Sequence, residues 1–391
     1  MPEIDMPHLA PHDLCTGCGA CANGCPKGAI HMLPDREGCL YPTVTDACIQ
    51  CGHCTHICPA LKQRERRPDP MVFAAWNPDE NVRRASTSGG VFTLLAEYIL
   101  EDGGVVFGAA MSPDFHVHHI AVKSKEQLSL LQGAKLVQSE IGDAYTRVRY
   151  YLDQGRRVLF TGTPCQIDGL YRFLGEHPEL LLTCDILCGG VPSPGVWAQM
   201  VRFMAYAKQK KPLSVTFCGK EEGQRDRYFR VTYEGGSTYT APLVKTDYGR
   251  GLHRRLFLRP ACHNCSYTCT DRVGDLSLGS YVHPPKDFFP DEQSRGICLL
   301  LINSPKGAHM FDLLPLKREK LSLSEAVAGS DALAAPPAVS EERSSFFNAY
   351  SQQSFYHVLE QFLRPLAMHR GRKKGKKQHR FPLKGLFRKK K

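Results

Sequence analysis

The chain has 391 residues, of which 42% are apolar and 23% are charged. This composition excludes wholesale disorder, collagen and a coiled coil, and the length allows two or three domains. The longest purely aliphatic runs, such as residues 299–302, are too short to span a bilayer, and the N-terminus lacks the basic patch and apolar stretch of a secretory signal. We therefore expect a cytoplasmic protein whose 17 cysteines serve metal or redox chemistry rather than disulfides.

The positive charge is concentrated at the C-terminal end. Lys and Arg number 50 against 39 Asp and Glu, which gives a net charge of +11. Residues 364–391 hold 13 of the basic residues and no acidic one, so the rest of the chain is nearly neutral. Such a tail, interleaved with Phe and Leu, is a solvated segment, a contact with an anionic membrane surface, or a guide for an acidic ferredoxin. Nucleic acid is disfavoured because no nucleic-acid fold signature accompanies the charge.

Four regions follow one another along the chain. Residues 1–62 are rich in cysteines and turns and predict a small domain, and residues 71–325 alternate strand-like and helix-like segments. Residues 338–363 predict a C-terminal helix that packs back on the body, before the basic tail at 364–391. In chain order, we expect strands at 105–111, 117–122, 157–160, 180–187, 214–218, 230–233, 238–241, 275–278 and 297–302, and helices at 91–100, 141–154, 166–174 and 195–208. The alternation predicts an α/β domain with a mixed sheet.

Two cysteine units of the same pattern repeat in the first region. The spacing is Cys-x2-Cys-x2-Cys-x3-Cys-Pro in both, which is the bacterial-ferredoxin spacing for 4Fe-4S clusters. Three cysteines of each unit wrap one cube, and the fourth, before the proline, points to the other cube. We therefore expect a bacterial-ferredoxin-like dicluster domain with one cluster on Cys15, Cys18, Cys21 and Cys58 and the other on Cys48, Cys51, Cys54 and Cys25. A zinc module is the alternative, although zinc sites do not need a doubled four-cysteine run with both prolines.

A second cysteine group lies in the larger region. Cys165 follows a predicted strand and precedes a helix, Cys188 ends a strand, and Cys262 and Cys265 form a Cys-x2-Cys pair. Loop positions at strand ends leave these thiols exposed for a metal, although the pair alone is also half a zinc site. Cys269 is an additional candidate, whereas four others are predicted to be ordinary buried thiols: Cys39, Cys184, Cys218 and Cys298.

An ordered series of motifs resembles the coenzyme F420 hydrogenase/dehydrogenase beta-subunit family over roughly residues 10–310. The motifs are STSGGVFTLLAEY at 86–98, GGVVFGAA at 103–110, KLVQS at 135–139, LFTGTPCQI at 159–167 and VPSP at 191–194, together with the N-terminal cysteine units. The resemblance implies FAD and iron–sulfur clusters that pass electrons between a ferredoxin-like donor and an organic two-electron acceptor. It also implies that Cys165, Cys188, Cys262 and Cys265 hold a third 4Fe-4S cluster.

The chain departs from this family pattern in two places. Gly189-Gly190 stands where members commonly have His-Gly, and Ser280-Tyr281-Val282 stands where they commonly have Asp-Phe-Trp. The departures remove the groups that would carry substrate and proton chemistry. We therefore assign no catalytic residue.

A flavin site is predicted around the start of the helix at 91–100. Arginines and the run Ser86, Thr87, Ser88, Gly89 and Gly90 precede this helix, whose free N–H groups suit a pyrophosphate. From the residues alone, an ordinary serine N-cap is an equal alternative, and the resemblance favours the phosphate. Four further residues are candidate polar contacts of the flavin: Lys135, Gln138, Ser139 and Thr163.

Two functional hypotheses follow, and a zinc-organised nucleic-acid binder is a weaker third. The first is an FAD- and iron–sulfur-dependent oxidoreductase with a ferredoxin-like partner and a small-molecule substrate, coenzyme F420 or another compound. The second is a non-catalytic electron-transfer subunit that delivers electrons to a partner enzyme. A flavin favours the first hypothesis, because it exchanges single electrons with clusters and a hydride with organic substrates.

Overall fold

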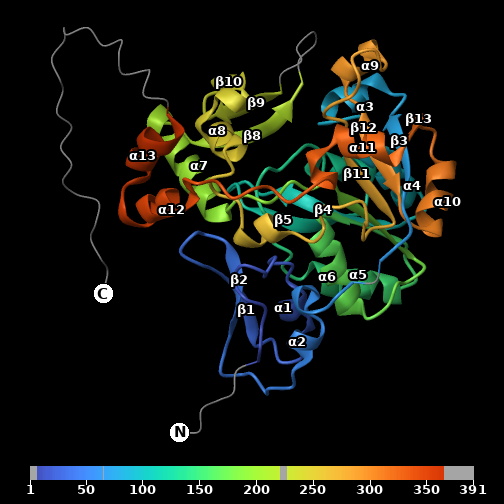
Figure 1. The fold of residues 1–391 in the computed structure, drawn as a ribbon, viewed down its shortest axis with the longest axis horizontal. Coiled ribbons are helices and arrows are strands. Elements are labelled where there is room, and N and C mark those ends of the chain that lie inside the picture. Colours follow the sequence, from blue (N-terminus) through green and yellow to red (C-terminus); the bar gives the residue numbers. More distant parts are fainter. Residues whose placement is uncertain (1–6, 65, 221–226, 365–391) are drawn as a thin grey trace.

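The computed structural model describes residues 7–64, 66–220 and 227–364. The predicted basic tail therefore lies, apart from Arg364, outside the described residues. The small N-terminal module lies at one end of the molecule, next to α5 (Ala144–Asp153) and α6 (Pro164–Leu174) of the large α/β region (Figure 1). Within the described ranges, no helix combines the length and the apolar composition that crossing a bilayer requires.

The N-terminal module is a hairpin with two short helices. Strands β1 (Ile30–Pro34) and β2 (Leu40–Val44) pair antiparallel. Helices α1 (Ala20–Gly24) and α2 (His53–His56) each begin after a glycine in the left-handed conformation, Gly19 with φ 75° and Gly52 with φ 71°. Glycine adopts this conformation without steric cost, so the two cysteine units share a turn as well as a spacing. A 3-10 helix, Pro59–Leu61, follows the second unit.

An eight-stranded mixed sheet forms the centre of the large region. Its order is β13-β3-β12-β11-β7-β6-β4-β5. The neighbours β11, β7, β6 and β4 run parallel, and all other pairs are antiparallel. The strands are β3 (Met71–Trp76), β4 (Val105–Met111), β5 (Val117–Val122), β6 (Val158–Gly162), β7 (Leu181–Ile186), β11 (Leu276–Ser280), β12 (Cys298–Ile302) and β13 (Lys317–Leu321). The predicted α/β fold with a mixed sheet is confirmed.

Helices cover both faces of this sheet. On one face, α4 (Val91–Glu101) and α10 (Pro305–Leu313) pack on strand residues such as Leu300. On the other face, α5 and α6 pack on β4 and β6, and this core continues into the N-terminal module through Cys18 and Ala20. The module is therefore attached to the body by a shared hydrophobic core, which fixes its position against α6.

A second layer packs beside β5 and β4. It contains the antiparallel sheet β10-β9-β8, with β8 (Pro212–Gly219), β9 (Tyr228–Tyr233), β10 (Thr238–Pro242), α7 (Pro194–Lys208) and α8 (Asp247–His253). The C-terminal segment packs on it through Phe346 and Val358, as predicted. The single helix predicted at 338–363 is wrong, however, because the segment is divided into α12 (Arg343–Gln352), α13 (Phe355–Val358) and a π-helix, Leu359–Leu363. Gln353 is extended, and the Ser354 side chain caps the next helix.

Short elements complete the chain. Strand β13 was not predicted, because its KREKL sequence is mostly exposed and charged, as is common at a sheet edge. The remaining helices are α3 (Glu80–Ala85), α9 (Pro290–Arg295), α11 (Leu323–Gly329) and 3-10 turns at Lys125–Leu130, Leu243–Lys245, Pro260–Asn264 and Asp331–Leu333.

Candidate functional site

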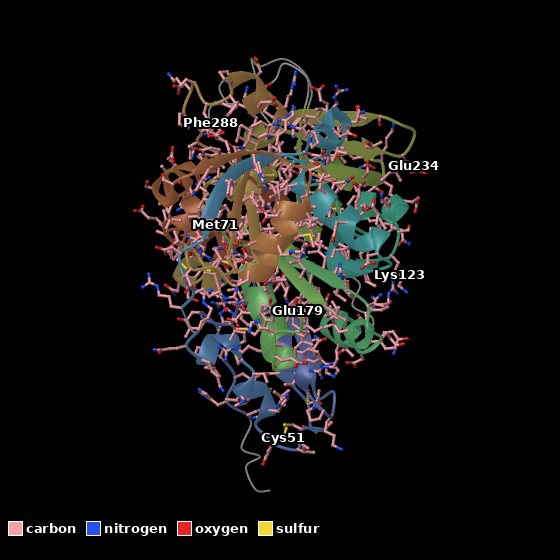
Figure 2. All side chains as sticks on the ribbon, turned by 90° about the vertical axis from the view of Figure 1, so that its right-hand side faces the viewer. Cys51, Met71, Lys123, Glu179, Glu234 and Phe288 are labelled. Atoms are coloured by element: carbon pink, nitrogen blue, oxygen red, sulfur yellow. The ribbon has the colours of Figure 1, made fainter. Side chains whose placement is uncertain are left out.

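The eight cysteines of the N-terminal module surround two separate cavities. Cys15, Cys18, Cys21 and Cys58 line one cavity. Cys25, Cys48, Cys51 and Cys54 line the other. Each cavity thus has three cysteines from one unit and the fourth from the other unit, which is the grouping that the spacing predicts. We call these the inner set and the outer set, because Cys51 lies at the end of the module far from the body (Figure 2).

The local environment of these thiols suits a cluster. Backbone N–H groups donate to sulfur in the outer set, from Ala29 to Cys25 at 3.3 Å and from Gln50 to Cys48 at 3.4 Å. In the inner set, burial and then the neighbouring thiols raise the pKa of Cys21 to about 12. The Cys21 thiol is therefore protonated when no metal is bound, and iron must displace its proton, because the thiolate is the ligand form.

The four cysteines predicted for a third cluster converge at the edge of the large sheet. Cys165 lies in the first turn of α6 after β6, Cys188 follows β7, and Cys262 and Cys265 lie in and after the 3-10 helix Pro260–Asn264. Every pair among the four is close enough for one thiolate to raise the pKa of the other. We call these residues the body set. They are partly buried rather than exposed as expected, and burial raises the pKa of Cys165 to about 12 and that of Cys188 to about 11.

Backbone donors and a buried ion pair hold the loops of the body set. The Gly190 N–H donates to Cys188 Sγ at 3.4 Å, and the Val191 N–H donates to Cys262 Sγ at 3.3 Å. Behind them, Arg272 donates to Asp185 at 2.5 Å, and the two side chains are 1% and 0% exposed. Arg272 also donates to the Tyr267 carbonyl at 2.7 Å. It therefore joins the loop after Cys265 to the end of β7.

Cys269 is not part of this convergence. Its thiol donates to the carbonyls of Ser266 at 3.4 Å and Asp271 at 3.3 Å. It is not among the groups that most strongly shift the pKa of Cys165, Cys188 or Cys262. The structure therefore favours the set without Cys269.

The inner set and the body set touch through helix α6. A Cβ added to Gly169, one turn after Cys165, would lie 3.0 Å from Cys18 Cβ and 3.1 Å from Cys18 Sγ. The Tyr145 hydroxyl donates to the carbonyls of Cys18 at 2.8 Å and Gln166 at 2.7 Å, so it joins the two backbones. The outer, inner and body sets therefore follow one another from the tip of the module into the sheet.

The predicted flavin residues separate into two places. In the loop before α4, Ser86 donates to the Val82 carbonyl and Ser88 donates to the Ile297 carbonyl, both at 2.7 Å. Thr87 accepts from the Ala134 N–H at 2.9 Å, which brings this loop next to Lys135. Gly90 is the N-cap of α4, and no side chain caps the first turn. The first N–H groups of α4 thus lack the serine cap that was the alternative, as a phosphate site requires.

Two lysines lie close to this loop. Lys220 donates to the carbonyls of Ser88 at 2.6 Å, Arg83 at 2.7 Å and Arg295 at 2.8 Å, and burial lowers its pKa to about 7. Burial likewise lowers the pKa of Lys135 to about 8. Arg83, in contrast, is already paired with Glu292. The two lysines therefore lie close to the loop with their charged forms disfavoured by burial, and the charge of Arg83 is already paired.

The other three predicted flavin contacts lie beside the cysteine sets. Gln138 donates to the Thr16 carbonyl at 3.1 Å, next to Cys15. Thr163 lies 3.1 Å from Cys165 Sγ through its hydroxyl. Ser139 shares a hydrogen bond of 2.8 Å with His119, whose pKa burial lowers to about 4. These residues are brought together with the inner and body sets, not with the loop before α4.

The remaining cysteines are consistent with ordinary thiols. Cys39, Cys184 and Cys298 are buried, and Cys218 is partly buried at a position with φ 53°. In the described part of the chain, no three His, Cys, Asp or Glu side chains are close enough to chelate a single metal ion.

Sequence reasoning missed the residues that join the sets. Gly169, Tyr145, Arg259 and the pair Arg272–Asp185 each connect segments far apart in the sequence. No local spacing reveals such contacts. The only signal was the position of Arg259, three residues before Cys262.

Three family models match consecutive parts of the chain. For the beta subunit of coenzyme F420 hydrogenase/dehydrogenase, the N-terminal model matches residues 72–143 and the C-terminal model matches residues 155–327. A 4Fe-4S dicluster domain matches residues 12–63.

Two curated proteins are similar in sequence to the chain. The chain is 23% identical over 289 residues to one subunit of the F420H2 dehydrogenase of Methanosarcina mazei, and the match covers 70% of this chain and 77% of that protein. It is 27% identical over 182 residues to a coenzyme F420-dependent sulfite reductase of Methanocaldococcus jannaschii, covering 44% of this chain and 27% of the relative. Among solved structures, a chain of the F420-reducing NiFe hydrogenase complex from Methanosarcina barkeri is similar at 17% identity and a TM-score of 0.42, covering 76% of this chain and 92% of that one.

Proposed function

The chain belongs to the coenzyme F420 hydrogenase/dehydrogenase beta-subunit family, and we propose that it is an iron–sulfur flavoprotein subunit that exchanges electrons with an organic substrate. Its 4Fe-4S dicluster domain is an electron-transfer module. The observation that carries the proposal is the order of the three cysteine sets, with Gly169 in contact with Cys18 between the inner set and the body set.

Each set would hold one 4Fe-4S cluster, twelve cysteines in all. Such clusters supply transfer of single electrons between neighbouring centres. The chain's own residues set the order of these centres. Cys51 is exposed at the outer end, Cys18 is buried against Gly169 of α6, and Cys165 lies one turn before Gly169 in the same helix. Electrons would therefore enter or leave at the tip of the module and pass inward along the sets.

FAD would bind at the loop before α4, where Ser86, Thr87, Ser88, Gly89 and Gly90 meet the uncapped helix start. Lys135 and Lys220 lie beside this loop, and a bound pyrophosphate would favour the charged forms that burial disfavours. A bound flavin would supply the exchange between single electrons and a hydride. Gln138, Ser139 and Thr163, beside the cysteine sets, would face the reacting end rather than the phosphates.

Two observations support a proposal for the partners: the exposed tip of the module and the names of the relatives. Cys51 and its neighbour Ile49, which is 56% exposed, form an accessible end where a ferredoxin-like donor would dock. Two of the relatives are named as part of an F420H2 dehydrogenase and as an F420-dependent sulfite reductase. We therefore propose coenzyme F420 as the first substrate to test. We also propose that the chain works in a complex with partner enzyme subunits.

The test is a reduction experiment on anaerobically purified protein. The clusters are reduced with dithionite, excess reductant is removed, and FAD and then oxidised F420 are added while the visible spectrum is recorded. We expect FAD to bind and to restore the cluster absorbance as F420 is reduced. Protein that binds FAD but transfers no electrons to it would contradict the proposed route.

The second candidate is a non-catalytic electron-transfer subunit. It is favoured by the two glycines after Cys188, where family members commonly carry His, because no acid or base stands there. In the same experiment, this candidate predicts reducible clusters without FAD binding and without transfer to F420. Electron transfer would then require a separately added partner enzyme.

A further inference from the structure

Arg259 is a buried arginine between the inner set and the body set. It is 0% exposed, and its Nε donates to the Cys15 carbonyl at 2.7 Å. Its Nη2 lies 3.6 Å from Cys15 Sγ, which is a hydrogen bond to sulfur. The guanidinium thus contacts both the backbone and the thiol of one residue of the inner set.

The surrounding residues fix this guanidinium. It lies 4.0 Å from the centre of the Tyr41 ring, and its Nη1 donates to the Leu40 carbonyl at 2.9 Å and to Gln138 Oε1 at 3.1 Å. A Cβ on Gly17 would lie 2.8 Å from the same Nη1, so only glycine leaves room for it. The cation is therefore held on the inner set rather than free to move away.

The backbone of Arg259 belongs to the body set. Its N–H donates to the Val191 carbonyl at 2.9 Å, and its own carbonyl accepts from the Cys262 N–H at 3.0 Å. One residue therefore has its main chain in the loop of one set and its side chain on the other.

This buried cation has no carboxylate partner among the described residues. Its hydrogen bonds end on two carbonyls, one amide oxygen and one sulfur. A buried charge without a counter-ion is strongly unfavourable. The titratable groups around it are instead the thiols of Cys15, Cys39 and Cys262 and the Tyr41 phenol, which carry no charge as thiols and phenol. A cluster bound by thiolates on the inner set would supply the missing negative charge.

We propose that Arg259 raises the reduction potential of the cluster on Cys15, Cys18, Cys21 and Cys58. An added electron makes a cluster more negative, and both a fixed cation and an N–H donor to a ligand sulfur stabilise that state. The reduced form is therefore favoured at the inner set, the centre between the outer set and the body set. This inference depends on the proposed function, because it assigns these four cysteines to a cluster.

The test is a redox titration of the full chain followed by electron paramagnetic resonance. Arg259→Gln removes the charge at similar length, and we expect the midpoint of the inner cluster to shift to a lower potential by more than the midpoints of the other two clusters. Arg259→Lys keeps the charge but loses the planar set of donors, so a smaller shift in the same direction is expected.

A matched control perturbs the contact between the N-terminal module and the body near Arg259 without changing the net charge of the protein. Arg343 pairs with Glu37 and donates to the Leu258 carbonyl at 3.0 Å, one residue before Arg259. The double variant Glu37→Gln with Arg343→Gln should therefore keep all midpoints at their wild-type values. A control that shifts as far as Arg259→Gln would show a general effect of the contact and would overturn the inference.

Iron content separates the remaining outcomes. An Arg259→Gln protein with full iron and an unchanged midpoint overturns the inference and leaves the proposed function standing. If Arg259→Gln does not retain iron, Arg259→Lys decides in the same way by its midpoint. Wild-type protein without iron contradicts the proposed function itself.

Discussion

The N-terminal module and the body set bring cysteines together in two different ways. In the module, three of the four ligands of each set lie three residues apart around a glycine turn before α1 or α2, and the fourth comes from the other unit of the same small domain. In the body, the ligands span about a hundred residues between Cys165 and Cys265, and three loops of the folded sheet must meet. The first kind of site depends on local geometry, and the second depends on the stability of the whole domain.

The largest effect on stability is expected when the buried ion pair behind the body set is broken. Arg272→Met leaves Asp185 buried and unpaired, which should cost about 3–5 kcal/mol of unfolding free energy and release the iron of the body set while the module keeps its own. Chemical denaturation and iron analysis measure both effects. Asp185→Asn combined with Arg272→Met removes the unpaired charge and should recover much of the loss. An Arg272→Met protein as stable as the wild type would contradict this dependence.

Removing one ligand should sharpen the assignment of the body set. Cys262→Ser is expected to lose about a third of the iron, because one of three clusters is affected. Cys269→Ser is the matched control, because the Cys269 thiol bonds two carbonyls and accepts from Arg64 outside the body set, and this variant should keep all of the iron. Iron and sulfide are determined per chain after anaerobic purification. The reverse pattern between these two variants would assign Cys269 as the ligand.

The body is also expected to be the acid-sensitive part. Burial lowers the pKa of His119 to about 4, from the usual value near 6.5 of an exposed histidine. The unfolded chain therefore binds a proton that the folded chain does not, so stability is complete above about pH 6.5 and falls toward pH 4, by at most about 3 kcal/mol. His119→Gln lacks this titration, and its apparent melting temperature should fall less between pH 7 and pH 5. Parallel pH profiles for the two proteins would contradict the prediction.

The smallest effect concerns the junction of the two regions. Tyr145→Phe removes the hydroxyl that joins the carbonyls of Cys18 and Gln166. We expect a loss of about 1–2 kcal/mol in unfolding free energy, because two buried carbonyls lose the one O–H donor that they share. Tyr150→Phe, on the same helix but 59% exposed, is the control and should leave stability unchanged. Equal denaturation midpoints for all three proteins would show that the junction does not depend on this hydroxyl.

The sequence predicted local features well and long-range contacts poorly. Strands β4 and β5 were predicted at their observed ends, because both read as short runs of strand-forming residues. The edge strand β13 was missed because its charged sequence carries no such pattern. Grouping of the module cysteines followed from spacing alone, whereas the partners of Arg259 and Gly169 depend on how α6 and the module pack. Gln138 and Ser139 were predicted as polar contacts of a flavin, and no local pattern indicated that they lie beside the cysteine sets.

The most direct measurement is the iron, sulfide and zinc content of the anaerobically purified wild-type chain, combined with paramagnetic resonance after reduction by dithionite. Three clusters in line predict about twelve irons and twelve sulfides per chain and the signals of interacting reduced centres. Eight irons would contradict the cluster of the body set. A zinc protein that stays silent after reduction would contradict the electron-transfer role as a whole.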